Sequence, residues 1–130
     1  MTSVKRIKDY SSLEQEPLKI GQLKLTDNQW PKHGEIQFEN VSFSYAKNLP
    51  QVLNELSFRI APGEKVGIVG RTGAGKSSII QAMFRMGVIA GQGRILIDGI
   101  DIKQLSLHDL RSKLSIIPVI YLFIAALNWK

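Results

Sequence analysis

One stretch of eight residues constrains this chain more than any other. Residues 70–77 have the sequence GRTGAGKS, which matches a glycine, any four residues, and then glycine, lysine and serine or threonine. An apolar run at 66–69 precedes it and a helical pattern follows it. A strand, a glycine loop and a helix in this order form the usual setting of a phosphate-binding P-loop. The stretch therefore predicts an α/β fold with a phosphate site between a strand and a helix.

Elementary electrostatics explains why these residue types suit a phosphate. Glycines let the backbone close around an anion, and the amides that open a helix point at it together with the positive end of the helix dipole. Lys76 would supply a full charge to the β- and γ-phosphates, and the Ser77 hydroxyl would be a Mg²⁺ ligand. The competing interpretation is a glycine-rich turn with a solvated lysine. The predicted ligands in the loop are Gly70, Thr72, Gly73, Ala74, Gly75, Lys76 and Ser77.

Composition narrows the class of protein. The 130 residues are 44% hydrophobic and 22% charged, which fits one small globular domain. The net charge is +6, but lysines and arginines are scattered without a basic stripe, so we expect no nucleic-acid partner. There is no cysteine, and the two histidines are far apart, so a metal site built from these side chains is not expected. We expect neither a signal peptide nor a membrane span.

Three strands are predicted before and into the loop. Residues 35–45 alternate with one phase slip, which a bulge at Glu39-Asn40 would correct so that one face stays buried. Residues 53–60 alternate again. Residues 64–69 are predicted as the third strand, because they end in the apolar run 66–69, which is typical of a strand covered on both faces.

Shorter elements follow the loop. A helix is predicted over about 75–86, with core contacts from Ile79, Ile80, Met83 and Phe84. Residues 94–97 read as a strand ended by a turn at Asp98-Gly99. Another strand is predicted at 114–117, before Pro118. The short helix between them would be capped by Ser106, with Asp109 in the capping box and Leu105 packed on Leu110.

Four segments together resemble the nucleotide-binding domain of ABC transporters. They are WPKHGEIQFENVSFSY (30–45), PGEKVGIVGRTGAGKSS (62–78), IDGIDI (97–102) and LHDLRSKLSIIP (107–118). The form GRTGAGKSS is most similar to the second such domain of subfamily C, the multidrug-resistance-associated exporters. The resemblance covers about 30–118. It implies a partial P-loop NTPase core of the ABC ATPase type, in which an antiparallel β subdomain leads into the P-loop strand and helix and the sheet is incomplete.

The resemblance also implies roles for residues outside the loop. Tyr45 matches the aromatic that stacks on adenine, and a buried strand tyrosine is the alternative. Val52 matches an apolar position beside the nucleotide, and Ser78 matches a residue that contacts the α-phosphate. ATP and Mg²⁺ are the implied ligands. Asp98 and Asp101 have no metal role in the family, and we interpret them as turn residues.

The remaining segments define the predicted organisation. Residues 1–29 resemble the tail of a membrane-domain helix and its linker, and 119–130 form a divergent apolar tail. Where the family has a glutamine that binds Mg²⁺, this chain has Val119. The signature motif, the second carboxylate motif with its glutamate, and the switch histidine are also absent from the sequence. We interpret this as a truncated or alternatively spliced product or a gene-model artefact, which sequencing the transcript across the Val119 codon would test.

These departures shape the expected function. The resemblance implies the ATP-binding part of an exporter that works with membrane domains and a second nucleotide-binding domain at the cytoplasmic face of a membrane. We expect weak Mg-ATP binding, no catalytic residue in this chain and negligible turnover. The 64–69 strand would have unpaired edges and uncovered apolar faces. The alternatives are a non-catalytic binding fragment, or another P-loop enzyme such as a small kinase. Membrane segments would choose the exported substrate, so this sequence does not reveal it.

Overall fold

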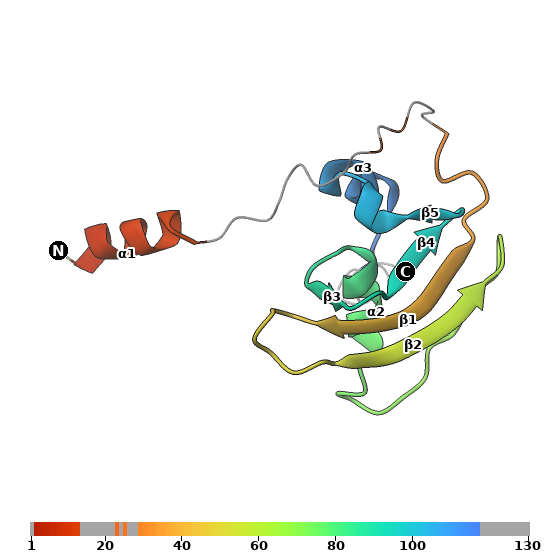
Figure 1. The fold of residues 1–130 in the computed structure, drawn as a ribbon, viewed down its shortest axis with the longest axis horizontal. Helices are drawn as coiled ribbons and strands as arrows, with labels where there is room; N and C mark the ends of the chain where they lie inside the picture. The colour runs from red at the N-terminus through yellow and green to blue at the C-terminus, as the bar shows by residue number, and fades with distance from the viewer. Residues whose placement is uncertain (1, 14–22, 24, 26–28, 118–130) are drawn as a thin grey trace, which may run out of the picture.

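A computed structural model describes residues 2–13, 23, 25 and 29–117 of the chain. An N-terminal helix, α1 (Thr2–Ser11), presents exposed side chains from Ser3 onward. The folded body begins at Trp30 and is built on a sheet of five strands (Figure 1). No helix in the described part is both long and apolar enough to cross a bilayer. The predicted tail at 119–130 lies outside the described residues.

The sheet is antiparallel throughout and centred on β1 (Ile36–Ser44). One edge of β1 pairs with β2 (Leu53–Ile60), and the other pairs first with β4 (Arg94–Ile97) and then with β3 (Val88–Ala90). A short strand, β5 (Ile100–Asp101), completes the sheet beside β4. The α/β class, the antiparallel β subdomain and the incomplete sheet are thus confirmed.

The predicted bulge is present in β1. The register with β2 shifts between Phe38 and Val41, and Asn40 has φ 47°. Because of this extra residue, Phe38, Val41 and Phe43 all face the core despite their change of parity. Ser57 closes the bulge, since its hydroxyl accepts from the Asn40 amide at 2.8 Å.

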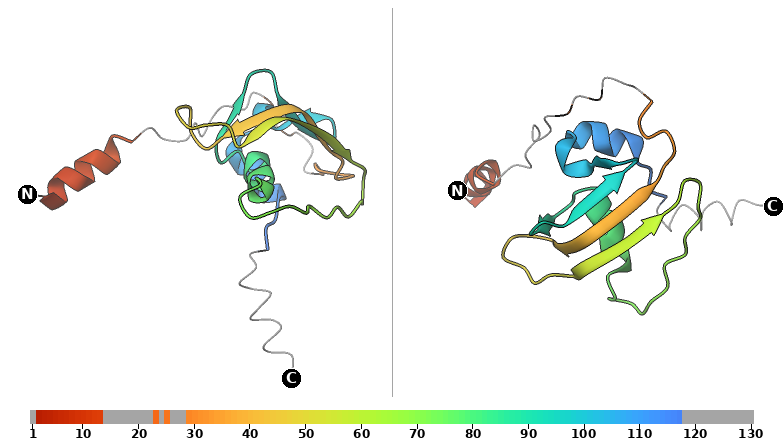
Figure 2. Two further views of the ribbon diagram at one scale, coloured as in Figure 1. Left: turned by 90° about the horizontal axis from the view of Figure 1, so that it is seen from below. Right: turned by 45° about the vertical axis from the view of Figure 1, so that its right-hand side comes forward.

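The core lies between the sheet and three helical segments. They are α2 (Lys76–Met83), the 3₁₀ turn η1 (Ile102–Gln104) and α3 (Leu107–Lys113). Figure 2 shows α2 beneath the curved sheet. The buried apolar side chains that form the core are Trp30, Phe38, Val41, Phe43, Leu53, Ala82, Ile95, Ile97, Ile102, Leu105 and Leu110.

The cap predicted for α3 is confirmed. The Ser106 hydroxyl accepts from the Asp109 amide at 3.0 Å and donates to its carboxylate at 2.7 Å. Leu105 and Leu110 are both fully buried. The cap and the two leucines therefore fix where the helix begins and hold it on the core.

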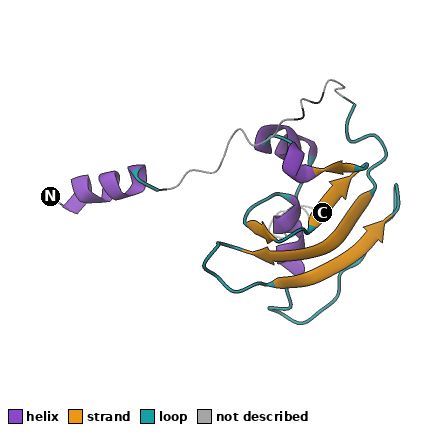
Figure 3. Ribbon diagram, in the orientation of Figure 1, coloured by secondary structure: helices purple, strands orange, loops and turns teal. Residues whose placement is uncertain are grey.

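Two predicted strands are wrong. Residues 64–69 form no ladder with another described segment, and Figure 3 draws the connection between β2 and α2 as loop. Residues 114–117 are likewise not a strand. A strand needs a neighbour to pair with its backbone, and none of the described strands lies beside either segment. The expected uncovered apolar face is confirmed, because Val66, Ile68 and Val69 are 50%, 46% and 98% exposed.

The helix prediction needs a correction of its own. The helix ends at Met83, earlier than expected, and Arg85 follows with φ 52°. Ile79 and Met83 pack on the core as predicted, but Ile80 is exposed. The buried face instead includes Ser78 and Ala82, which hydrophobic periodicity overlooks because one is polar and the other small. The strand β3, which lies between Gly87 and Gly91, is also not predicted by the sequence pattern.

Candidate nucleotide site

The P-loop lies directly before α2, as the sequence predicts. Gly73 and Gly75 both have φ 85°, a left-handed conformation that favours glycine. Gly75 is buried, and a Cβ there would meet Leu53 Cδ2 at 3.2 Å and the Val52 carbonyl at 3.4 Å. Positive φ and the close approach of Leu53 therefore both require glycine at this position.

Lys76 folds back onto its own loop. Its Nζ donates to the carbonyl oxygens of Gly70 and Arg71, each at 2.6 Å. The Ala74 amide donates to the Arg71 carbonyl at 3.1 Å and closes the turn between them. The ammonium is thus held beside the mouth of the loop by neutral carbonyls, which an anionic phosphate oxygen would outcompete because charge-assisted bonds are stronger.

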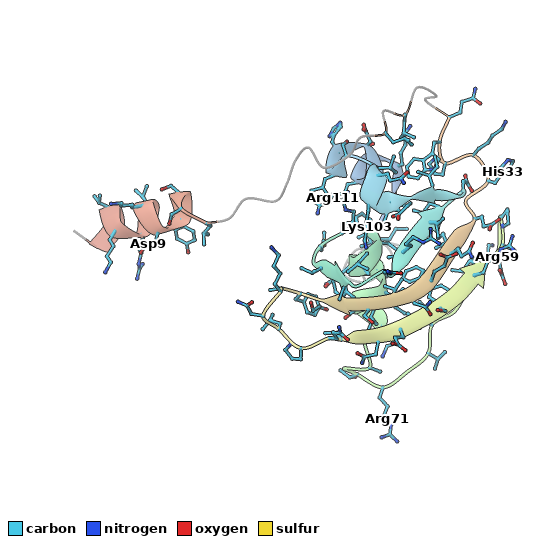
Figure 4. The ribbon with its side chains drawn as sticks, in the orientation of Figure 1. Asp9, His33, Arg59, Arg71, Lys103 and Arg111 are labelled. Atoms are coloured by element: carbon cyan, nitrogen blue, oxygen red, sulfur yellow. The ribbon has the colours of Figure 1, made fainter. Side chains whose placement is uncertain are left out.

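Arg71 contributes its backbone carbonyl to these hydrogen bonds, but its side chain points away from the loop (Figure 4). Figure 4 shows the Arg71 side chain projecting outward from the loop into solvent. In contrast, the side chain of Lys76 is partly buried. The loop therefore presents one inward and one outward cation.

A cavity of about 450 Å³ opens at the N-terminus of α2. The first amides of a helix have no partner within it, so this end suits an anion. Predicted residues from three segments meet here, although Tyr45 and Ser78 are 33 residues apart. The lining residues are Tyr45, Val52, Thr72, Gly73, Gly75, Lys76, Ser77 and Ser78. Of the predicted ligands, Gly70 and Ala74 lie outside the lining and shape the loop behind it.

Tyr45 and Val52 line the same cavity from outside the P-loop. Tyr45 follows the end of β1, and its ring meets Phe43 edge-on with centroids 5.4 Å apart. Val52 is held by its amide, which donates to the Phe43 carbonyl at 2.7 Å. Tyr45 as a whole remains 43% exposed, so it has surface available for a ligand.

Ser77 fits a Mg²⁺ ion only in part. Its side chain is exposed at the cavity and offers one oxygen, whereas Mg²⁺ prefers six oxygen ligands. The described residues contain no group of three histidine, cysteine, aspartate or glutamate side chains that could hold a metal. The donor set therefore suits an ion that arrives with phosphate oxygens and water as its other ligands.

Asp98 is a structural residue, as predicted, with a role that the sequence did not reveal. Its carboxylate accepts from the amides of Lys32, His33 and Glu35 at 2.6, 2.9 and 2.8 Å. Burial raises the pKa of Asp98, but these backbone hydrogen bonds outweigh burial and lower it below the ordinary value. Asp101 caps η1 by accepting from the Lys103 amide.

Comparison with known proteins agrees with this geometry. A family profile described as ABC transporter matches residues 53–123, more than half of the chain. The chain belongs to the ABC transporter family. The P-loop and the helix that follows it lie inside the matched range. Membership in the ABC transporter family removes the support for a small kinase.

Individual members of the ABC transporter family show the same relationship. The chain is 60% identical to the ABC-type transporter cicA of Emericella nidulans over 89 residues, which are 68% of this chain and 6% of that protein. It is 48% identical to ATP-binding cassette sub-family C member 2 of Rattus norvegicus, over 91% of this chain and 8% of the relative. The predicted resemblance to subfamily C exporters is confirmed.

A solved structure supports the fold. The chain resembles a bacterial Atm1-family ABC exporter with ATP bound, with a TM-score of 0.66 and 35% identity. The match covers 91% of this chain and 19% of that one. The chain thus spans less than a tenth of the two curated relatives named above and about a fifth of the exporter structure.

Proposed function

We propose that this chain binds Mg-ATP in the cavity at the start of α2, as part of the nucleotide-binding domain of an ABC exporter. The observation that carries the proposal is the meeting of Tyr45 and Val52 with the P-loop around one cavity of about 450 Å³. That volume lies within the range of small-ligand pockets. An aromatic and an apolar side chain beside the phosphate-binding loop suit a nucleotide better than a free phosphate.

In this proposal the phosphates lie at the loop. Lys76 leaves the carbonyls of Gly70 and Arg71 and binds the β- and γ-phosphates, while the amides that open α2 surround the anion. Ser77 contributes one oxygen to a Mg²⁺ ion that would balance the charge of the phosphates. Ser78 contacts the α-phosphate.

In the same cavity, Tyr45 stacks on the adenine and Val52 packs beside it. Stacking of a base on an aromatic ring is worth about 1–3 kcal/mol. The exposure of Tyr45 at the cavity supports this role. The ring and the loop thus bind the base and the phosphates of one nucleotide.

Binding by this chain would be weak and turnover negligible. Hydrolysis needs a group that positions or deprotonates water. The cavity lining contains no carboxylate and no imidazole. Turnover would require a second nucleotide-binding domain, assembled with such a module and with membrane domains at the cytoplasmic face of a membrane.

Titration with Mg-ATP tests the proposal. Lys76→Ala should weaken binding by at least about tenfold, because a charge-assisted phosphate contact is lost. Lys65→Ala is the matched control, since it removes the same charge from an exposed position outside the cavity lining. Equal affinity in Lys76→Ala and wild type would refute the phosphate site, and ATP hydrolysis abolished by Lys76→Ala would refute the absence of turnover.

A second candidate function is that of a non-catalytic binding fragment. The uncovered apolar side chains of Val66, Ile68 and Val69 favour it, because such patches commonly mark contact surfaces. Co-expression with the membrane domains of a sub-family C exporter tests this function. A complex that survives purification in detergent supports it, and complete separation opposes it.

A further inference from the structure

A pair of hydroxyl groups joins Tyr45 to α2 in the proposed nucleotide site. The Tyr45 hydroxyl lies 2.8 Å from Ser78 Oγ, and either atom can be the donor. Tyr45 comes from the chain just beyond β1, whereas Ser78 lies in the first turn of α2. The contact therefore connects the aromatic platform to the helix that receives phosphate.

Ser78 has few ways to reach a phosphate oxygen. The residue is only 3% exposed, and its amide donates to the Gly75 carbonyl at 3.0 Å. Its hydroxyl has a single proton to donate and two lone pairs that can accept. If that proton points to Tyr45, none remains for a phosphate. If Tyr45 is the donor, the proton of Ser78 is available.

Tyr45 is well placed to be the donor. A phenol is a better proton donor than an aliphatic alcohol, and the edge contact with Phe43 holds its ring at the cavity. A phosphate oxygen accepts but does not donate, so its arrival favours the arrangement in which protons run from Tyr45 to Ser78 to phosphate. Hydrogen bonds in such a chain strengthen one another.

We propose that Tyr45 has a second role beside stacking: its hydroxyl donates to Ser78 Oγ and thereby turns the Ser78 proton toward a bound phosphate. Tyr45 is a positioning residue for the phosphate end of the site. The inference rests on the proposed function, because it requires a phosphate at the start of α2. It makes recognition of the phosphate depend on an aromatic side chain outside the P-loop.

Inorganic tripolyphosphate separates this role from stacking, because it has no base. Calorimetric titration of the 130-residue chain with Mg-tripolyphosphate should show about threefold to tenfold weaker binding by Tyr45→Phe, the range expected for one lost hydrogen bond. Tyr45→Phe keeps the ring and its contact with Phe43. Tyr10→Phe makes the same chemical change on exposed α1 and should bind as wild type does.

Ser78→Ala supplies a second, independent measurement. It should also weaken tripolyphosphate binding, and Tyr45→Phe should have no further effect in that background. Unchanged or tighter binding by Tyr45→Phe would overturn the inference and leave the proposed function intact, as would additive losses in the double variant. Absence of tripolyphosphate and ATP binding by wild type would overturn the proposed function and this inference with it.

Discussion

The sheet around β1 and the segment that leads to the P-loop are both rich in apolar residues, yet they have opposite environments. Phe38 and Val41 in β1 are buried, and β1 has paired neighbours along both edges. Val66 and Val69 are exposed in a stretch with no paired strand in the described part of the chain. Hydrophobicity alone thus does not bury a strand; its backbone must also be satisfied by neighbours.

The largest expected contrast is between single side chains of these two regions. Phe38→Ala should lower the free energy of unfolding by about 3–5 kcal/mol, because it opens a cavity and removes the stack on Phe58, whose centroid is 4.4 Å away. Val69→Ala should change it by no more than about 0.5 kcal/mol. Chemical denaturation measures both, and a large loss in Val69→Ala would show that 64–69 is packed in solution.

Two glycines, one in each region, give a second contrast with a smaller expected effect on stability. A Cβ at Gly87 would lie 2.5 Å from the Ser44 carbonyl oxygen, so Gly87→Ala should cost about 1–3 kcal/mol of stability. Gly67, in the exposed segment, has no atom within 4 Å of the corresponding point. Gly67→Ala should therefore be close to neutral in the same denaturation assay. Similar losses in both variants would contradict the contrast.

The hydrogen bonds of Asp98 with the turn before β1 give a pH-dependent test of the packed region. Asp98→Asn keeps a residue that tolerates φ 49° but loses the charge that accepts three amides, so stability at neutral pH should fall by about 1–3 kcal/mol. Because the fold lowers the pKa of Asp98, its contribution is full above the ordinary value of 3.8 and is lost as pH falls through the lowered value.

Denaturation of wild type and Asp98→Asn between pH 7 and pH 2 measures this effect. The two curves should converge at the acid end, where the wild-type carboxyl is protonated. Asp9→Asn, on exposed α1, should follow wild type throughout. A gap between wild type and Asp98→Asn that stays constant with pH would show that the charge of Asp98 does not hold the turn.

Much of the local structure followed from sequence patterns. Alternation located β1 and β2, and the turn at Asp98-Gly99 marked the end of β4. The parity slip located the bulge at Asn40, and Ser106 marked the start of α3. The P-loop pattern located the cavity, because glycine conformation and a helix start are encoded within a few residues. The roles of its individual residues stay predictions.

Other features depended on segments that the sequence does not relate to each other. The Asp98 contacts join residues more than 60 positions apart. The buried face of α2 includes Ser78 and Ala82, whereas Ile80 is exposed. Residues 64–69 looked like a strand because 66–69 are apolar. Whether they form one depends on which backbone lies beside them, which is not a local property.

By itself, the sequence determined that a glycine loop closes onto the start of a helix and that a bulged antiparallel sheet precedes it. Those features arise from backbone preferences and side-chain periodicity within short stretches. Only the tertiary structure decided that Lys76 rests on its own loop, that Tyr45 meets Ser78 at 2.8 Å, and that the approach to the loop is not a strand. Contacts of this kind depend on the positions of whole elements, which are set by packing across the sheet.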